Sequence, residues 1–461
     1  MSKLVLMAFA VMTTAAAVGQ TKAVISLKGA LNTALVNYPE LKSKRYLVAS
    51  AEATVTDAEH QELPAFFFSD QVDLGTDNGA GGSYFPMGII PSTSGGIRTD
   101  NITSTFSGNL GVAYLQHELY NFGLNGARID AARSLVDFSN ADYQESTYLL
   151  QYHVAQLYFE LLRYRLLVNV QQKNIDRYSV LYNYIKAFTK SGIKPGVDSS
   201  IANAEVSRAR IEYVQSSEAY RKLKQEFLYY TGYKVADFDI DTTLYGLPEE
   251  RLGRMQQSVA GESVDNGNPV LAFYNNRWEY SLSQENLISK SYLPKLYLVG
   301  SAWMRGSSIS PKDVFGSLST GLDYSRYNYM AGIALTYNIV DLLHQSDRTT
   351  IQHLQTESMQ QDAVQQRTEL ERQLQQADIA IQAVMERERE IPRLLSAAQN
   401  VFAQKSAQYN AGIANITELE EASYLLYKAE IDEVELLPDL LNTLLNKAVT
   451  NNTLNAFLTN F

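Results

Sequence analysis

Apolar and polar residues alternate with a period of two in two short stretches of the chain. Between residues 327 and 337, tyrosine and aliphatic side chains occupy every second position, and Asn328, Met330 and Thr336 lie between them. This pattern predicts a β-strand with one apolar face. Ten residues at roughly 3.3 Å each on a tilted strand cover about 25 Å, with tyrosines at both rims. The pattern therefore favours a strand that faces lipid over the alternative, a soluble hairpin with one buried face.

A second stretch, residues 65–75, repeats the alternation less regularly. Phe66, Phe68, Val72 and Leu74 form an apolar row, which Asp70 interrupts. The sequence predicts four such strands, at about 65–75, 103–115, 295–304 and 327–338.

Much longer stretches show apolar residues in alternating steps of three and four, the spacing of a coiled-coil seam. The seam positions are Tyr152, Ala155, Phe159, Leu162 and Leu166 in one stretch, and Leu370, Leu374, Ala377, Ile381 and Val384 in the other. A helix over residues 121–188 would extend about 100 Å at roughly 1.5 Å per residue. Pro392 falls inside the second stretch, so we expect a kink or break near Ile391.

The same order of elements occurs twice along the chain. Residues 37–41 resemble residues 267–271, and the triplet Gly192, Ile193 and Asp198 recurs as Gly412, Ile413 and Glu418. Each copy predicts a helix of about 35 residues, a strand that begins at a proline, a polar loop, a second strand and a long helical hairpin.

The predicted domains follow from this duplication. Residues 1–19 have the basic residue, apolar run and small-residue end of a secretory signal peptide. Repeat 1 covers 20–256 with its hairpin tip at about 188–198. Repeat 2 covers 257–461 with its tip at about 409–421 and a C-terminal segment.

Composition narrows the class of protein. The 461 residues carry a net charge of −11 and include no cysteine, so disulfides and an N-terminal lipid anchor on cysteine are excluded. Nucleic-acid binding is disfavoured, because it requires clustered Lys and Arg. No run reaches the 18 or so apolar residues of a membrane-spanning helix, so strands must make any crossing. Four strands cannot close a barrel, whereas three copies would supply twelve strands and twelve long helical segments.

The signal peptide, the tandem repeats and the Gly-x5-Asp/Glu motif at each tip resemble the TolC family of outer-membrane efflux and secretion channels. The resemblance implies a mixed α/β membrane protein. Its fold would be a trimeric, twelve-stranded transmembrane β-barrel, with four strands per protomer, continuous with a long α-helical periplasmic barrel. An equatorial belt would come from about 232–266 and the tail beyond Leu436.

Family resemblance also assigns roles at the tips. It implies a periplasmic gate at Asp198, Glu418, Glu421 and Lys194, and adaptor docking at Gly192, Ile193, Gly412, Ile413 and Tyr409. Glu418 and Glu421 share a helix face, so a trimer would stack them as acidic rings that favour cations; the alternative is a solvated acidic face. Ala414 stands where the family often has a clamping Arg, and we expect Lys194 to replace it by pairing with Glu418 or Asp198. Tyr327, Tyr329 and Tyr337 would form the aromatic membrane belt.

The favoured function is a passive exit duct for small molecules in a tripartite efflux system. The homotrimer would contact outer-membrane lipid, a periplasmic adaptor and an inner-membrane transporter of the resistance-nodulation-division type. Alternatives are the exit duct of type I protein secretion and, from another class, a soluble periplasmic coiled-coil scaffold. An enzyme is disfavoured, because the five histidines form no catalytic constellation and no Walker phosphate loop is present. No cofactor or metal is expected.

Overall fold

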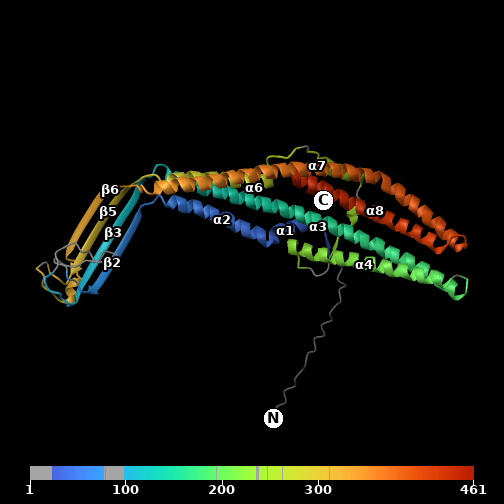
Figure 1. The fold of residues 1–461 in the computed structure, drawn as a ribbon, viewed down its shortest axis with the longest axis horizontal. Helices are drawn as coiled ribbons and strands as arrows, with labels where there is room; N and C mark the ends of the chain where they lie inside the picture. The colour runs from blue at the N-terminus through green and yellow to red at the C-terminus, as the bar shows by residue number, and fades with distance from the viewer. Residues whose placement is uncertain are drawn as a thin grey trace, which may run out of the picture. The chain divides into compact units, whose positions relative to one another are not determined.

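The chain is described here from a computed structural model, in which residues 23–76, 78, 98–193, 195–234, 238–246, 248–261, 263–310 and 312–461 are placed (Figure 1). The expected signal peptide and Lys194 lie outside these residues. The fold divides into two compact units. The strand unit comprises Glu40–Glu145 and Pro269–Thr368, and the tip unit comprises the other described residues.

A four-stranded antiparallel sheet forms the centre of the strand unit. It contains β2 (Ala65–Gly75), β3 (Phe106–Tyr120), β5 (Lys295–Ser307) and β6 (Arg326–Thr336), in the order β2-β3-β5-β6. Figure 1 shows the four strands side by side. Each copy of the repeat contributes one hairpin, and β3 and β5 join the two hairpins.

One face of this sheet is apolar and exposed. Phe66 and Phe68 of β2 and Tyr329 and Ile333 of β6 all expose most of their side chains. The register places Phe68, Ala113, Ala302 and Tyr329 in one row across the sheet, so the apolar residues of all four strands share this face. The alternation predicted for residues 327–335 therefore corresponds to a real division between two faces. A large exposed apolar surface is typical of contact with lipid or with another protein, because its exposure to water is unfavourable.

The helices that precede the first strand of each copy differ from the expectation of one helix of about 35 residues. In the first copy, α1 (Leu27–Asn37) ends at Tyr38 and α2 (Pro39–His60) follows. Tyr38 is extended, with ψ 121°. Pro39 has no backbone N–H and disfavours a helical conformation at the residue before it, so the helix divides there. In the second copy α6 (Pro269–Ser291) stands at the place of α2, and a separate helix, α5 (Glu249–Ser258), precedes it.

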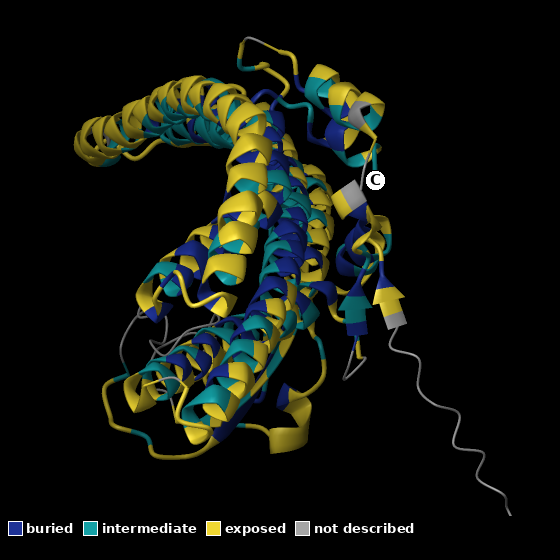
Figure 2. Cartoon of the chain, turned by 90° about the vertical axis from the view of Figure 1, so that its right-hand side faces the viewer, coloured by how far each residue is buried: buried dark blue, intermediate teal, exposed yellow. Residues whose placement is uncertain are grey.

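Two very long helices begin in the strand unit and continue into the tip unit. They are α3 (Leu124–Lys190) and α7 (Asp341–Asn410), and each is followed by a returning helix, α4 (Gly196–Thr231) or α8 (Ile416–Thr450). The coiled-coil seam is confirmed, because Phe159, Leu162, Leu370 and Leu374 are buried. Figure 2 shows buried positions recurring along the long helices. The expected break near Ile391 is absent: α7 passes through Pro392 as one helix. In the described residues, no helix combines the length and the apolar character needed to cross a membrane.

The remaining elements pack in the tip unit. Strand β1 (Ala23–Ile25) pairs in parallel with β4 (Phe238–Ile240), and the buried Tyr158 hydroxyl donates to the Ile25 carbonyl at 3.0 Å. After β4 come the 3-10 helix η1 (Thr243–Gly246) and α5, and the short helix α9 (Leu454–Leu458) follows α8. Phe159 and Phe457 contact edge to face with ring centroids 6.4 Å apart. These contacts hold the C-terminal segment against the middle of α3.

Candidate functional site

The two hairpin tips have the same turn. Gly192 and Gly412 both have φ 73°, in the left-handed region where glycine is favoured. At the first tip the Ile193 N–H donates to the Phe188 carbonyl at 3.0 Å, and at the second the Ile413 N–H donates to Gln408 at 2.9 Å. This is the Schellman arrangement that ends a helix. The Gly-Ile pair of each copy is therefore explained by the turn that it makes.

Both isoleucines point outward. Ile193 is 65% exposed and Ile413 is 78% exposed. An exposed isoleucine next to a rigid turn offers an apolar contact point with little side-chain entropy to lose on binding. Gly192, Ile193, Gly412 and Ile413 are thus placed where a partner could reach them.

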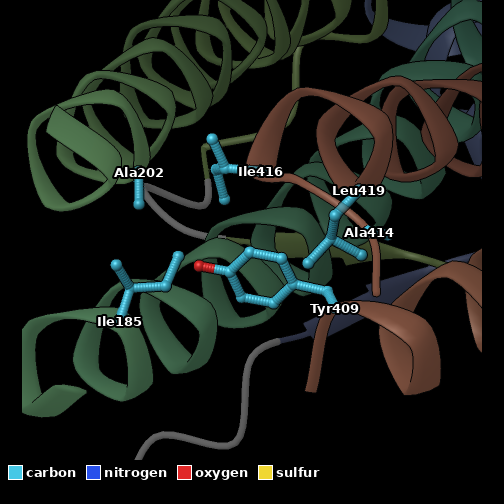
Figure 3. Close-up of a cluster of buried hydrophobic side chains, with 6 residues drawn as sticks. All are labelled: Ile185, Ala202, Tyr409, Ala414, Ile416 and Leu419. Atoms are coloured by element: carbon cyan, nitrogen blue, oxygen red, sulfur yellow. The ribbon is translucent and has the colours of Figure 1, made fainter. Parts of the chain in front are cut away.

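Tyr409 lies inside the tips instead. Its side chain is only 1% exposed, and it packs in an apolar cluster that also contains Ile185, Ala202, Ala414, Ile416 and Leu419. Figure 3 shows the ring projecting from α7 toward Ile185 of α3. The cluster takes residues from α3, α4, α7, α8 and the second turn, so it joins the two hairpins. The predicted docking role of the Tyr409 side chain conflicts with this burial, and its position fits internal support.

Asp198 lies beside the cluster at the start of α4. Burial, followed by the effect of the nearby Asp198 carboxylate, raises the pKa of Tyr409 to about 12. Asp198 is half-buried. The contact between Asp198 and Tyr409 ties the first turn of α4 to the end of α7.

Glu418 has a partner in the same hairpin. Lys405 Nζ lies 2.5 Å from Glu418 Oε2, and the Glu418 N–H donates to Asn415 Oδ1 at 2.9 Å. The hydrogen bond from Lys405, with that from the backbone, lowers the pKa of Glu418. Lys405 therefore neutralises Glu418 within one hairpin, and the expected pairing of Lys194 with Glu418 or Asp198 lies outside the described residues. Glu421, one turn further on α8, is exposed.

Glu420 was not among the predicted gate residues, although the structure gives it the least usual carboxyl group of the tips. Burial, then repulsion by Glu205 of α4, raises the pKa of Glu420 to about 7, while Arg208 opposes the shift. Among the described residues none donates a hydrogen bond to its buried Oε1 atom. The sequence does contain a clue, since Ile416, Glu420, Ser423 and Tyr427 follow the four-three-four steps of a helix seam.

A groove of about 510 Å³ lies in the tip unit between α3, α7 and α8. Val180, Leu181, Tyr184 and Phe402 form its apolar lining. Arg177 binds Glu430 at 2.6 Å, and its guanidinium lies 5.5 Å from the centroid of the Phe402 ring. The groove thus combines an apolar lining with charged and polar residues close to the tips.

The three predicted belt tyrosines lie at or near β6. Tyr327 and Tyr329 are on its apolar face and strongly exposed, whereas Tyr337 follows the last residue of the strand, Thr336, and is less exposed. Across the described ranges, no group of three or more His, Asp or Glu side chains is arranged to hold a metal.

Comparison with known families decides what kind of protein carries these features. Residues 30–227 and 267–446 match the model of the outer membrane efflux protein family. The chain belongs to this family. The two matched segments fall one in each repeat, which confirms the duplication and the resemblance drawn from it.

Solved structures agree on the fold. The CmeC outer membrane channel of Campylobacter jejuni has a TM-score of 0.73 at 14% identity, covering 93% of this chain and 86% of CmeC. VceC of Vibrio cholerae, an outer membrane protein, has a TM-score of 0.71 at 14% identity, with coverage of 92% and 95%. The MtrE outer membrane channel of Neisseria gonorrhoeae has a TM-score of 0.67 at 14% identity, with coverage of 93% and 89%. Among curated proteins the chain has no match.

Membership of the outer membrane efflux protein family sets the broad function. The protein is an efflux channel of the outer membrane and not an enzyme. Its mixed α/β fold with two tandem repeats is that of solved outer-membrane channels.

Proposed function

We propose that three copies of this chain form a passive exit duct for small molecules. The three sheets would close into a twelve-stranded barrel in the outer membrane, and the long helices would form a tunnel through the periplasm. The observation that carries the proposal is the sheet itself. Its apolar face is exposed, and in the described part of the chain each edge strand, β2 or β6, pairs with one neighbour only and has an unpaired outer edge. An open edge in lipid would leave backbone groups unsatisfied, and closure with neighbouring copies removes it.

The proposed boundaries are those of the duplication: a signal peptide at 1–19, repeat 1 at 20–256 and repeat 2 at 257–461. Tyr327, Tyr329 and Tyr337 would lie at the two lipid–water interfaces, where tyrosine rings are favoured. The segment 232–266 and the C-terminal tail would surround the tunnel as a belt.

The proposed partners act at the tips. A periplasmic adaptor would contact Gly192, Ile193, Gly412 and Ile413, and an inner-membrane transporter of the resistance-nodulation-division type would supply the energy. Exposure of the two isoleucines supports this placement. Tyr409 would hold the tips from inside without touching the adaptor.

The proposed gate is electrostatic. In a trimer, Asp198, Glu418 and Glu421 would be repeated around the narrow end of the tunnel, with Lys194 close to them in sequence. Lys405 already compensates Glu418. We therefore place the uncompensated acidic ring at Glu421, and leave to Lys194 the pairing with Asp198.

Single-channel recording of the purified protein in a planar bilayer tests the duct. Discrete conductance steps that require detergent-extracted trimers would support it. A mature polypeptide that is monomeric and soluble without detergent would overturn it. Crosslinking from a photoreactive residue at Ile413 in cells would then identify the partner, and capture of a protein-secretion transporter would transfer the function to type I secretion.

A further inference from the structure

One part of the apolar face of the sheet is covered by the chain's own backbone. Residues 316–324, which we call the strap, lie between β5 and β6 and contain the 3-10 helix η2 (Leu318–Gly321). The strap contacts Ser107, Asn109 and Gly111 of β3. These three residues pair with Leu74, Val72 and Asp70 of β2, so the strap lies on the same face as the apolar row of that strand.

Polar side chains on this face form hydrogen bonds with the strap. The Ser107 hydroxyl donates to the Leu318 carbonyl, and Asn109 Nδ2 donates to the Leu322 carbonyl at 3.0 Å. Both side chains are buried. The Tyr324 hydroxyl donates to Asp70 Oδ1 at 2.6 Å. The carboxylate that interrupts the apolar row of β2 thus receives its hydrogen bond from the strap.

Two glycines, which have no side chain, allow the strap to lie directly on the strands. A Cβ atom built on Gly306 would be 2.0 Å from the Asp323 carbonyl oxygen, and one on Gly321 would be 2.1 Å from Ser107 Oγ. Neither approach is possible for any residue larger than glycine. Gly300, on the same face of β5, shows the contrast, because a Cβ there would meet Leu115 at an ordinary 3.8 Å.

The outer side of the strap carries two leucines among the exposed polar side chains of Ser317, Ser319, Thr320 and Asp323. Leu318 is 44% exposed and Leu322 is 49% exposed, although the carbonyls of both residues are bonded to β3 beneath them. The strap therefore turns its polar backbone toward the sheet and its leucines away from it. A segment that exposes leucines and polar side chains together suits the boundary between lipid and water.

We propose that the strap is a lipid-contacting surface, held on the outside of the barrel against the outer leaflet of the membrane, and that it does not cover the pore. This rests on the proposed function, in which the apolar face meets lipid and the loops between β2 and β3 and between β5 and β6 are extracellular. Below the strap, β5 retains about nine residues, Lys295–Trp303, which at roughly 3.3 Å each and a tilt of about 40° span ~23 Å. That is close to the apolar band of such barrels, about 25 Å. The strap would then lie at the upper edge of this band, level with Tyr327, which pairs with Met304.

Fluorescence quenching tests the contact with lipid. The chain has no cysteine, so Leu318→Cys and Leu322→Cys each provide a single site for a fluorophore. The matched control is Asn328→Cys, on the opposite face of β6. In vesicles of phosphatidylcholine with brominated acyl chains, we expect the labels at 318 and 322 to be quenched severalfold more than the label at 328. Aqueous iodide should give the reverse order. Labels at 318 and 322 that iodide quenches as strongly as the control would overturn the proposal.

A glycine pair tests whether the strap is held by close approach. Gly306→Ala, in the Leu322→Cys background, should push the strap off the strands, lower quenching by the brominated chains and raise quenching by iodide. Gly300→Ala should change neither. Equal responses of the two alanine variants would contradict a strap that lies directly on the strands.

Single-channel conductance shows whether a failure lies in the placement of the strap or in the proposed duct function. A bulky thiol reagent on Leu318→Cys should leave the single-channel conductance unchanged, whereas the same reagent on Asn328→Cys should lower it. A fall in conductance on modification at 318 would place the strap over the pore and overturn the inference while the duct stands. Absence of channels from the unmodified protein would instead contradict the duct, and the quenching order would still decide whether the strap meets lipid.

Discussion

At the first tip α3 turns at Gly192 and α4 begins after Pro195, whereas at the second tip α7 turns at Gly412 and α8 begins after Asn415. The turns are equal in backbone angle and in hydrogen bonding. The side chains that secure them are not, because Pro195 makes no side-chain cap, while Asn415 caps α8 and Lys405 binds Glu418. The copies have kept the turn, which the backbone requires, and have diverged in what holds each hairpin closed. Among the described residues, the side-chain cap and the ion pair belong to the second hairpin.

The largest difference in stability between equivalent substitutions at the two tips should come from Tyr409, which packs against both hairpins. Tyr409→Ala removes a buried aromatic side chain from the shared cluster, and we expect a loss of about 3–5 kcal/mol in the free energy of unfolding. Thr189→Ala, at the equivalent place in the first copy, should cost far less, since Thr189 lies outside that cluster. Chemical unfolding in detergent, followed by circular dichroism, measures both. Equal losses of unfolding free energy in the two variants would contradict the conclusion that Tyr409, and not Thr189, packs between the hairpins.

Next in size are the two turn glycines. Gly192→Ala and Gly412→Ala each place a Cβ in open space but at φ 73°, so only backbone strain opposes them. We expect each to cost about 1–2 kcal/mol, and the two costs to agree. The same unfolding measurement applies. A clear inequality would show that the turns are not equivalent in energy despite equal geometry.

Removal of the residue before α4 or before α8 should change the free energy of unfolding by a smaller amount, and by a different amount at each tip. Asn415→Ala removes the acceptor of the Glu418 N–H and should cost about 1 kcal/mol. Pro195→Ala removes no hydrogen bond from α4, so we expect a markedly smaller change there. Limited proteolysis at each tip is a second readout, and it should show faster cleavage near residue 415 only in the Asn415 variant.

The smallest expected effect is a dependence of the stability on pH, which arises where Glu420 of α8 lies near Glu205 of α4. The pKa of Glu420 is raised to about 7, so the folded tips bind a proton there that the unfolded chain has already released. This contribution to stability is present below the ordinary glutamate pKa of about 4.3 and is lost as pH rises to about 7. Glu420→Gln should remove that loss from a series of unfolding curves between pH 4 and 8. Glu421→Gln, one residue on and exposed, is the control and should preserve it.

Sequence patterns predicted the repeats, the coiled-coil seams and the family, because each depends on periodicity within a short stretch. Position in the sequence did not reveal which side of the tip Tyr409 would occupy, since that depends on α3 and α4 meeting α7 and α8. Glu420 was missed for the same reason: its altered pKa comes from burial and from Glu205 on a different helix. Asp70 interrupts the apolar row of its strand, and the strap, far away in sequence, supplies a hydrogen-bond donor for it.

Pairing of β1 with β4 has a consequence for how the protein is made. Ala23–Ile25 at the start of the described chain finds its parallel neighbour, Phe238–Ile240, only after the whole first copy has been synthesised. Contacts between residues so distant in sequence form late and slowly, because a long loop must close before they contribute. Ala23–Ile25 must therefore wait for its partner strand until more than 200 further residues have been added to the chain.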